Sequence, residues 1–281
     1  MPENRADARE YGHLPLPGGE STRVRDSGGG GTPVLLLHGL ANSLEIWERV
    51  QPRLATRFRV IAFDWPGFGE ASRPEGRYDG AFFAERLAAL MDALAIERAH
   101  LVGYSLGASV ILHFGERHPA RIDQAVLAAP GSFGRRVHPL MLPPAWPGIG
   151  RWLGRPNPRN NRTTLRLALH DRAQLTPELE ARTNRHAAIA GSAMSFHRTL
   201  TAGVGPFGAR GVGAMARRAR AFTRPALILW GENDRIFPPR YAQRAVQLLP
   251  DARLSMIADC GHYPQWEQPA VFAAAAEAFL G

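Results

Sequence analysis

The stretch Gly103-Tyr104-Ser105-Leu106-Gly107 decides how this sequence folds. It ends the apolar run His100–Gly103, which predicts a strand, and it opens the amphipathic stretch Leu106–Arg117, which predicts a helix. A glycine on each side of Ser105 permits a tight turn that a larger side chain would crowd. The pattern G-x-S-x-G between a strand and a helix therefore predicts that Ser105 is lifted out at the edge of a sheet.

Similar apolar runs alternate with helical patterns along the chain, which indicates a mostly parallel sheet covered by helices. The runs are rich in β-branched residues and leucine, so the strands are expected to be buried on both faces. A span near Thr22–Arg25 is expected to add an antiparallel edge hairpin. The predicted strands are Val34–His38, Arg59–Phe63, His100–Gly103, Ala125–Ala129, Ala226–Trp230 and Arg253–Ile257, and the predicted core helices are Ala81–Leu94, Leu106–Arg117, Arg240–Leu248 and Ala270–Leu280.

This alternation stops between Ala129 and Ala226. The region is rich in proline and glycine, shows helical patterns near Thr164–His170 and Pro177–Ile189, and contains no candidate for a central strand. We predict a helical cap at residues 131–224, inserted between two parts of the core at residues 1–130 and 225–281. The predicted fold class is therefore α/β, with a mostly parallel central sheet flanked by helices and a helical cap over one end.

Charge is distributed unevenly over the 281 residues, whose formal net charge is +9. All 34 basic side chains are arginine, which is typical of a compositional bias of the source genome. From Gly131 to Arg224 there are 16 arginines and three acidic residues, a net charge of +13, whereas the remainder of the chain carries −4. Two interpretations stay open: a solvated arginine surface, and a cap that selects an anionic or carrier-bound substrate.

Several classes of site and location are not expected. Cys260 is the single cysteine, so no internal disulfide is possible, and it is interpreted as a packed thiol. The polar N-terminus and the lack of any long apolar run predict a cytoplasmic protein without a membrane span. No phosphate-binding glycine motif or metal-ligand spacing is present, so we expect no cofactor and no metal, and His113 and His186 are predicted on helix surfaces. No nucleic-acid partner is expected, and the oligomeric state is left open.

A serine hydroxyl is a weak nucleophile that needs a base, and the base needs an acid to orient it. Asp234 follows the predicted strand Ala226–Trp230, and His262 follows Arg253–Ile257. Because the carboxyl ends of parallel strands meet at one edge of a sheet, both residues are expected near Ser105. The sequence thus predicts Ser105, Asp234 and His262 as a catalytic triad.

A serine nucleophile also needs donors for the negative charge that develops on the carbonyl oxygen. The backbone N–H groups of Leu40, after the first central strand, and Leu106, after Ser105, are predicted to form this oxyanion hole. His38 is expected to brace the first of these loops, and the loop Asp64–Gly69 is interpreted as a structural turn.

From about Val34 to Leu280 the chain resembles the α/β-hydrolase superfamily. The matching features are His38-Gly39, Asp64–Gly69, the turn at Ser105, Gly231–Asp234 and Gly261–His262, in the superfamily's order. The tail Cys260–Glu267 and the cap segment Leu175–Arg182 are similar to the C–C bond hydrolases that cleave meta-cleavage products of aromatic breakdown, and the chain also resembles carboxylesterases. This resemblance implies substrate contacts for Arg182 and Trp266.

Three positions depart from the C–C hydrolases. Leu40-Ala41-Asn42-Ser43 replaces a glycine-rich stretch, Tyr104 replaces the usual Asn, and Tyr263 replaces the usual Trp. We therefore predict hydrolysis of a small-molecule carboxylic ester through an acyl-enzyme, with C–C hydrolysis and acyl transfer as alternatives. A non-catalytic binding module is the remaining alternative, which the complete triad disfavours. Serine at position 105 argues against dehalogenases and epoxide hydrolases, which use aspartate there.

Overall fold

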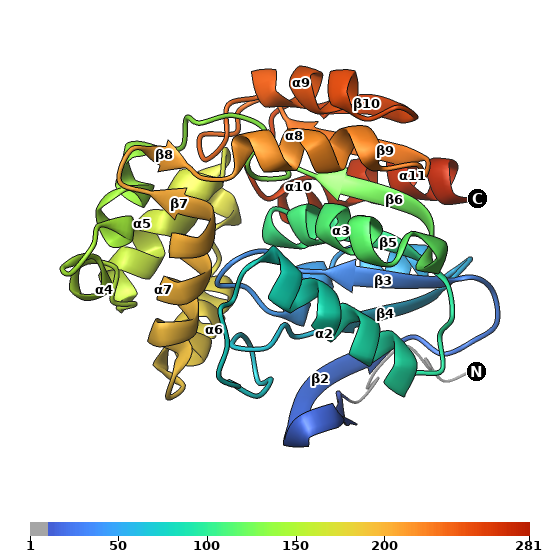
Figure 1. Cartoon of the computed structure of the whole chain (residues 1–281), viewed down its shortest axis with the longest axis horizontal. Helices are drawn as coiled ribbons and strands as arrows, with labels where there is room; N and C mark the ends of the chain where they lie inside the picture. Colours follow the sequence, from blue (N-terminus) through green and yellow to red (C-terminus); the bar gives the residue numbers. More distant parts are fainter. Residues whose placement is uncertain (1–10) are drawn as a thin grey trace.

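The central feature of the computed structural model, which describes residues 11–281, is an eight-stranded sheet in the order β1-β2-β4-β3-β5-β6-β9-β10 (Figure 1). The strands from β4 to β10 in this order are parallel, while β2 runs antiparallel to both β1 and β4. The strands are β1 Gly12–Leu16, β2 Glu20–Asp26, β3 Pro33–Leu37, β4 Arg59–Phe63, β5 Ala99–Tyr104, β6 Ile122–Ala128, β9 Ala226–Gly231 and β10 Ala252–Ile257.

All six predicted central strands are confirmed, with ends that differ by at most a few residues. The expected edge hairpin near Thr22–Arg25 is confirmed, and β2 is the strand of it that contains these residues. Its partner β1 was not predicted, because its sequence GHLPL contains a proline and has only two strongly apolar side chains. Such a strand belongs at a sheet edge, where a missing backbone donor costs no ladder hydrogen bond.

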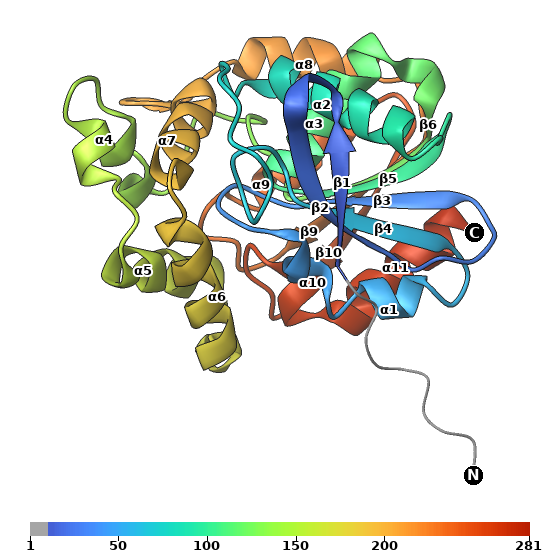
Figure 2. The ribbon, with the colours of Figure 1, turned by 90° about the horizontal axis from the view of Figure 1, so that it is seen from below.

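Helices cover both faces of the sheet (Figure 2). Side chains alternate along each parallel strand: Leu35 and Leu37 of β3 enter the core on one face, and Val34 and Leu36 enter the core on the other. This explains why the strands are continuously apolar. The first face is covered by α2 (Gly80–Ala93), α3 (Leu106–Arg117), α8 (Val212–Ala221) and α9 (Arg240–Leu248), and the second by α1 (Gln51–Leu54), α10 (Pro264–Glu267) and α11 (Pro269–Leu280).

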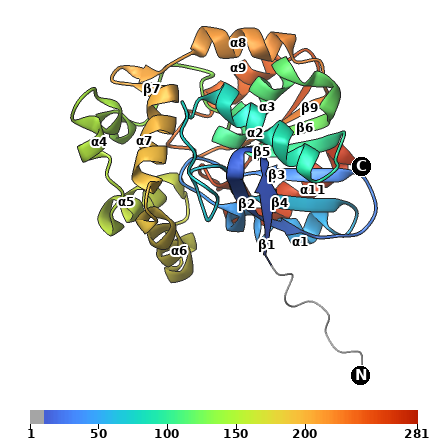
Figure 3. The same cartoon turned by 60° about the horizontal axis from the view of Figure 1, so that its bottom comes forward.

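A further group of helices lies beyond the carboxyl ends of the parallel strands (Figures 1 and 3). We call residues 131–211, between β6 and α8, the insert. Helix α8 follows the insert and packs on α3 and α9 of the core layer. None of the helices in residues 11–281 has the length and hydrophobicity that a membrane crossing requires. The insert contains α4 (Gly150–Leu153), α5 (Pro158–Ala168), α6 (Pro177–Ala188), α7 (Ser192–Gly203) and the hairpin of β7 (Val204–Gly205) and β8 (Gly208–Ala209).

The sequence predicted α5 and α6 but not α7. Helix α7 has the sequence SAMSFHRTLTAG, in which serine, threonine and glycine are poor helix formers. It is helical because it packs between other parts of the insert, with α6 and α4 as neighbours. Tertiary packing therefore overrides local propensity in this helix.

A buried ion cluster joins strand β2 to the loops that follow β3 and β4. The Arg23 guanidinium forms ion pairs of 2.8 Å with Glu45, 2.9 Å with Asp64 and 3.0 Å with Glu70. Asp64 is fully buried and also accepts hydrogen bonds from the backbone N–H groups of Leu44 and Glu70. Burial raises the pKa of Asp64, and the neighbouring Arg23 opposes that rise. The cluster thus holds the loop Asp64–Gly69 in place as the predicted structural turn.

Replacement of Arg23 by methionine should lower the free energy of unfolding by about 3–5 kcal/mol, because the buried carboxylates lose their counter-charge. Urea unfolding followed by circular dichroism measures this loss. Arg59→Met is the matched control, since Arg59 forms a partly exposed 2.7 Å ion pair with Asp26 and should cost only about 0–1 kcal/mol. Similar losses in the two variants would contradict a structural role for the buried cluster.

Candidate active site

The turn between β5 and α3 places Ser105 in a conformation that L-residues rarely adopt, with φ 53° and ψ −109°. The flanking glycines permit it. A Cβ atom on Gly107 would lie 2.1 Å from the carbonyl oxygen of Leu37, and one on Gly103 would lie 2.6 Å from the backbone nitrogen of Ala108. Helix α3 therefore starts in direct backbone contact with β3 and β5, and a side chain at either glycine would crowd the turn, as the sequence predicted.

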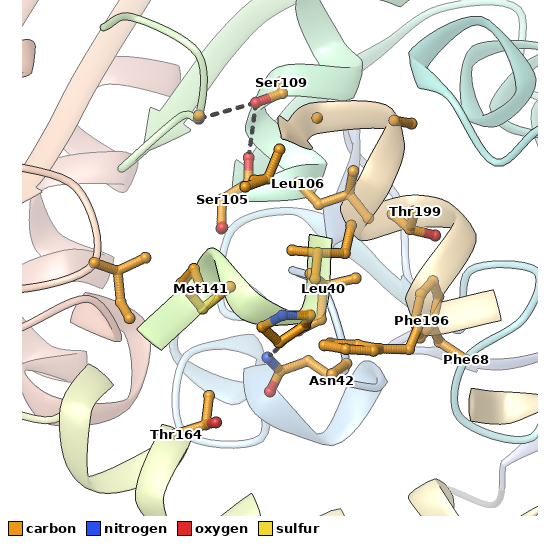
Figure 4. Close-up of a pocket in the computed structure, with 18 of the residues that line it drawn as sticks. Leu40, Asn42, Phe68, Ser105, Leu106, Ser109, Met141, Thr164, Phe196 and Thr199 are labelled. Carbon is orange, nitrogen blue, oxygen red and sulfur yellow. Dashed lines mark hydrogen bonds between the residues drawn. The ribbon is translucent and has the colours of Figure 1, made fainter. Parts of the chain in front are cut away.

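Hydrogen bonds hold the backbone of this turn. The Ser105 N–H donates to the carbonyl oxygen of Ala128 at 2.8 Å. The Ser109 hydroxyl donates to the carbonyl oxygen of Ser105 at 3.2 Å and accepts from the Gly131 N–H at 2.9 Å (Figure 4). Ser109 was not singled out in the sequence, although it stands four residues after Ser105, where it shares a face of the helix.

Ser105, His262 and Asp234 form one chain of hydrogen bonds. The Ser105 Oγ lies 3.1 Å from His262 Nε2, and His262 Nδ1 lies 2.7 Å from Asp234 Oδ2. The second carboxylate oxygen of Asp234 accepts from the N–H groups of Ile236 and Phe237 at 2.8 and 3.0 Å. These two bonds fix the rotation of the carboxylate, so that Oδ2 faces the imidazole. The three residues predicted from strands distant in sequence are thus brought together.

The insert contacts the loop that carries His262. The His262 N–H donates to the carbonyl oxygen of Ala168 at the end of α5, at 2.6 Å. The buried Glu267 carboxylate accepts from the Gly261 N–H at 2.9 Å and from the N–H groups of His170 and Asp171 at 2.6 and 3.1 Å. Glu267 therefore links the histidine loop to the insert. No role was predicted for Glu267 from the sequence, although an acidic side chain in an apolar tail is a signal for such a buried anchor.

The predicted oxyanion residues lie at the same place. Leu40 and Leu106 both line the cavity that contains Ser105, and within residues 11–281 neither backbone N–H has a protein acceptor. Leu106 is the first residue of α3, where N–H groups are unpaired and the helix dipole favours negative charge. Both amides are therefore available to a ligand.

His38 supports the loop that carries Leu40. Its Nε2 accepts from the Trp65 N–H at 2.9 Å, and its Nδ1–H donates to the carbonyl oxygen of Gly39 at 2.8 Å. Burial lowers the pKa of His38 to about 4, so the ring is neutral near pH 7. This is the bracing contact expected from the sequence. The Cys260 thiol is also buried as expected, and burial raises its pKa.

A cavity of about 560 Å³ opens in front of Ser105, between the core and the insert. Its wall is largely apolar, with polar contributions from Asn42, Thr164 and Thr199 (Figure 4). His113 and His186 also line it, which corrects their predicted place on helix surfaces: the His113 ring packs against Gly80 at the start of α2, and α6 turns His186 inward. The labelled apolar side chains of the wall are Leu40, Phe68, Leu106, Met141 and Phe196.

Arg182 and Trp266 do not line this cavity, so the structure gives no support to their predicted contact with substrate. The Arg182 guanidinium forms a 2.9 Å ion pair with Glu48 and lies 5.2 Å from the centre of the Trp266 ring. The Trp266 indole is buried and donates to the carbonyl oxygen of Gln174 at 3.1 Å. Both side chains therefore join the insert to the core, a contact between distant segments that no local pattern reveals.

The family model described as alpha/beta hydrolase fold matches residues 32–269. The chain belongs to the α/β-hydrolase family. A 2-hydroxymuconate semialdehyde hydrolase of Pseudomonas putida is 33% identical over 96% of this chain and 94% of the relative. A solved meta-cleavage product hydrolase from Pseudomonas fluorescens is 27% identical, with a TM-score of 0.80 over 96% of this chain and 97% of its own. A carboxylesterase of Bacillus subtilis, 24% identical, shares the fold with a TM-score of 0.83 over 98% of this chain and 92% of its own. The family and the names of these relatives show that the chain is a hydrolase.

For this α/β-hydrolase, Asp234→Asn should fold normally and lose about 10⁴-fold in kcat, because an amide favours the wrong tautomer of His262. Turnover of p-nitrophenyl butyrate and the thermal unfolding midpoint measure the two properties. The control is Asp259→Asn, which removes a carboxylate whose side chain is 89% exposed. Loss of turnover in the control, with Asp234→Asn still active, would place the orienting acid elsewhere.

Proposed function

We propose that this α/β-hydrolase cleaves small carboxylic esters through an acyl-enzyme on Ser105. The Ser105 oxygen attacks the carbonyl carbon while His262 Nε2 takes the hydroxyl proton and Asp234 orients the imidazole. The N–H groups of Leu40 and Leu106 donate to the developing oxyanion. His262 then returns the proton to the leaving alcohol. A water molecule attacks the acyl-enzyme with His262 again as base, which releases the acid and restores Ser105.

The observation that carries this proposal is the unbroken hydrogen-bonded chain from Ser105 through His262 to Asp234 at the floor of an apolar cavity. A volume of about 560 Å³ is suited to a small molecule. Leu106, Phe68 and Met141 offer apolar surface to an acyl or alkyl group.

The small number of basic residues in the cavity wall supports an uncharged ester as the substrate. Apart from histidines, Arg210 and Arg218 are the basic residues that line the cavity, and Arg218 forms a 2.7 Å ion pair with Glu116. Arg182, on which the expected preference for an anionic substrate depended, is engaged with Glu48. Most of the arginines between residues 131 and 224 therefore lie outside the cavity wall. We propose a neutral substrate in place of an anionic or carrier-bound one.

C–C bond cleavage is the second candidate, favoured by the activities for which several relatives are named. The substrates of such enzymes carry a carboxylate, which requires a charged or strongly polar partner in an apolar cavity. Tyr104 and Tyr263 stand here at the two positions where the resembling C–C hydrolases usually carry Asn and Trp. Both are buried, and the Tyr263 hydroxyl accepts from Asn42 at 3.3 Å. The cavity wall offers mainly apolar surface to such a carboxylate, which favours an ester substrate.

Replacement of Ser105 by alanine should abolish turnover, with a loss on the order of 10⁴ to 10⁶ in kcat, because only the oxyanion donors and binding remain. A fluorophosphonate probe should label the wild type at Ser105, as seen by mass spectrometry, and leave the variant unlabelled. Ser132→Ala is the matched control, since Ser132 also lines the cavity but forms no hydrogen bond to the triad within residues 11–281. Wild-type turnover in Ser105→Ala would show that the nucleophile is misassigned.

The enzyme should turn over neutral esters with a clearly higher kcat/KM than anionic esters. We expect kcat/KM for p-nitrophenyl hexanoate to exceed that for the p-nitrophenyl monoester of a dicarboxylic acid of equal length by about ten-fold or more, because the largely apolar wall desolvates the carboxylate. Arg182→Ala should change both values by the same factor. Faster turnover of a 2-hydroxy-6-oxo-dienoic acid than of any ester would favour C–C cleavage instead.

A further inference from the structure

The outer end of the insert exposes large apolar side chains to solvent. Five of the eight large exposed apolar residues in the described chain fall between residues 140 and 153. Trp152 is 72% exposed and Trp146 is 48% exposed. Clustered exposure of this kind marks an interaction surface, since isolated surface apolar residues are ordinary and contiguous ones are not. The five residues, which we call the apolar tip, are Leu140, Trp146, Ile149, Trp152 and Leu153.

The apolar tip is built on short elements that project from the body of the protein. It spans the 3-10 helices η4 (Pro139–Met141) and η5 (Pro143–Ala145) and helix α4. In three different views α4 lies at the end of the molecule farthest from the sheet (Figures 1, 2 and 3). The tip is therefore free to meet a flat surface without interference from the core.

The charge around the apolar tip has one sign. Residues 131–170 contain seven arginines and no acidic residue. Arg151, Arg155, Arg159 and Arg166 are exposed, and none of the four forms an ion pair within residues 11–281. Arginines next to exposed tryptophans are the combination that binds the headgroup region of an anionic bilayer, where the indoles enter the interface and the guanidinium groups face phosphates.

The tip is continuous with the cavity. Leu140 and Leu153 are exposed at the tip and also line the cavity in front of Ser105, together with Met141, Pro143 and Pro144. An apolar molecule that leaves a membrane at the tip would thus pass along apolar side chains to the cavity without crossing bulk water.

We propose that the apolar tip docks on the surface of an anionic phospholipid bilayer. A second copy of this chain is disfavoured as the occupant, because a symmetric contact through the tip would bring the two sets of arginines together. The proposal concerns binding alone, so it is tested without turnover, and its failure would leave the proposed ester hydrolysis untouched.

Tryptophan fluorescence of the full chain offers a direct test. Trp47, Trp65, Trp230 and Trp266 are at most 2% exposed, so changes in solvent exposure report on Trp146 and Trp152. Vesicles of phosphatidylcholine with about 30% phosphatidylglycerol should shift the emission to the blue and protect the two indoles from acrylamide. Vesicles of phosphatidylcholine alone should bind about ten-fold more weakly, and salt should weaken only the binding to anionic vesicles.

Two paired substitutions separate the apolar from the charged contribution, with vesicle sedimentation as the readout. Trp146→Ser with Trp152→Ser, and Arg151→Gln with Arg155→Gln, should each lower the partition coefficient by about ten-fold or more. Thermal unfolding should be unchanged, because all four side chains are exposed.

The matched controls lie on the core. Val271→Ser removes a 48% exposed apolar side chain of α11, and Arg217→Gln with Arg220→Gln removes two exposed charges of α8. Neither control should change binding. Absence of vesicle binding, binding that survives both tip variants, or a dimer in sedimentation velocity that the tryptophan pair abolishes would overturn the proposal.

Discussion

The contact between the backbone of Gly107 and the carbonyl oxygen of Leu37 is the constraint on which the site depends. Because no Cβ separates them, α3 begins directly against β3 and the chain must turn sharply at Ser105. The resulting backbone conformation, with φ 53°, costs on the order of 1–3 kcal/mol for a residue other than glycine. Hydrogen bonds from the Ser105 N–H to Ala128 and from Ser109 to the Ser105 carbonyl oxygen keep the turn in place. The same contact brings the loop of Leu40 next to the first amide of α3.

The insert completes the site by polar contacts and encloses it by apolar ones. The Glu267 carboxylate accepts hydrogen bonds from N–H groups of both the histidine loop and the insert. The carbonyl oxygen of Ala168 accepts a hydrogen bond from the N–H of His262. The cavity between the two parts is lined mainly by carbon. A substrate that fills this cavity therefore displaces water from the side of Ser105 that it occupies, which strengthens every electrostatic interaction there.

The arginines of the insert divide into two groups with different roles. Arg182 lies at the junction with the core, where its guanidinium group and that of Arg49 of the core lie over the Trp266 ring and form polar contacts. Arg151 and Arg155 are exposed near the apolar tip. An arginine count for residues 131–224 merges the two groups, so the net charge of +13 is a poor guide to the charge that a substrate meets in the cavity.

The amino-acid sequence by itself determined the six central strands, four of the core helices and the strand ends at which Ser105, Asp234 and His262 stand. These features follow from local periodicity and from the rule that parallel strands end at one edge, so they require no knowledge of distant contacts. Only the tertiary structure decided the direction of Arg182, the place of His186, the role of Glu267 and the helicity of residues 192–203. Each of these depends on partners far away in the chain, such as Glu48 for Arg182. A side chain takes its direction from the packing and charge of those partners, which local sequence patterns do not encode.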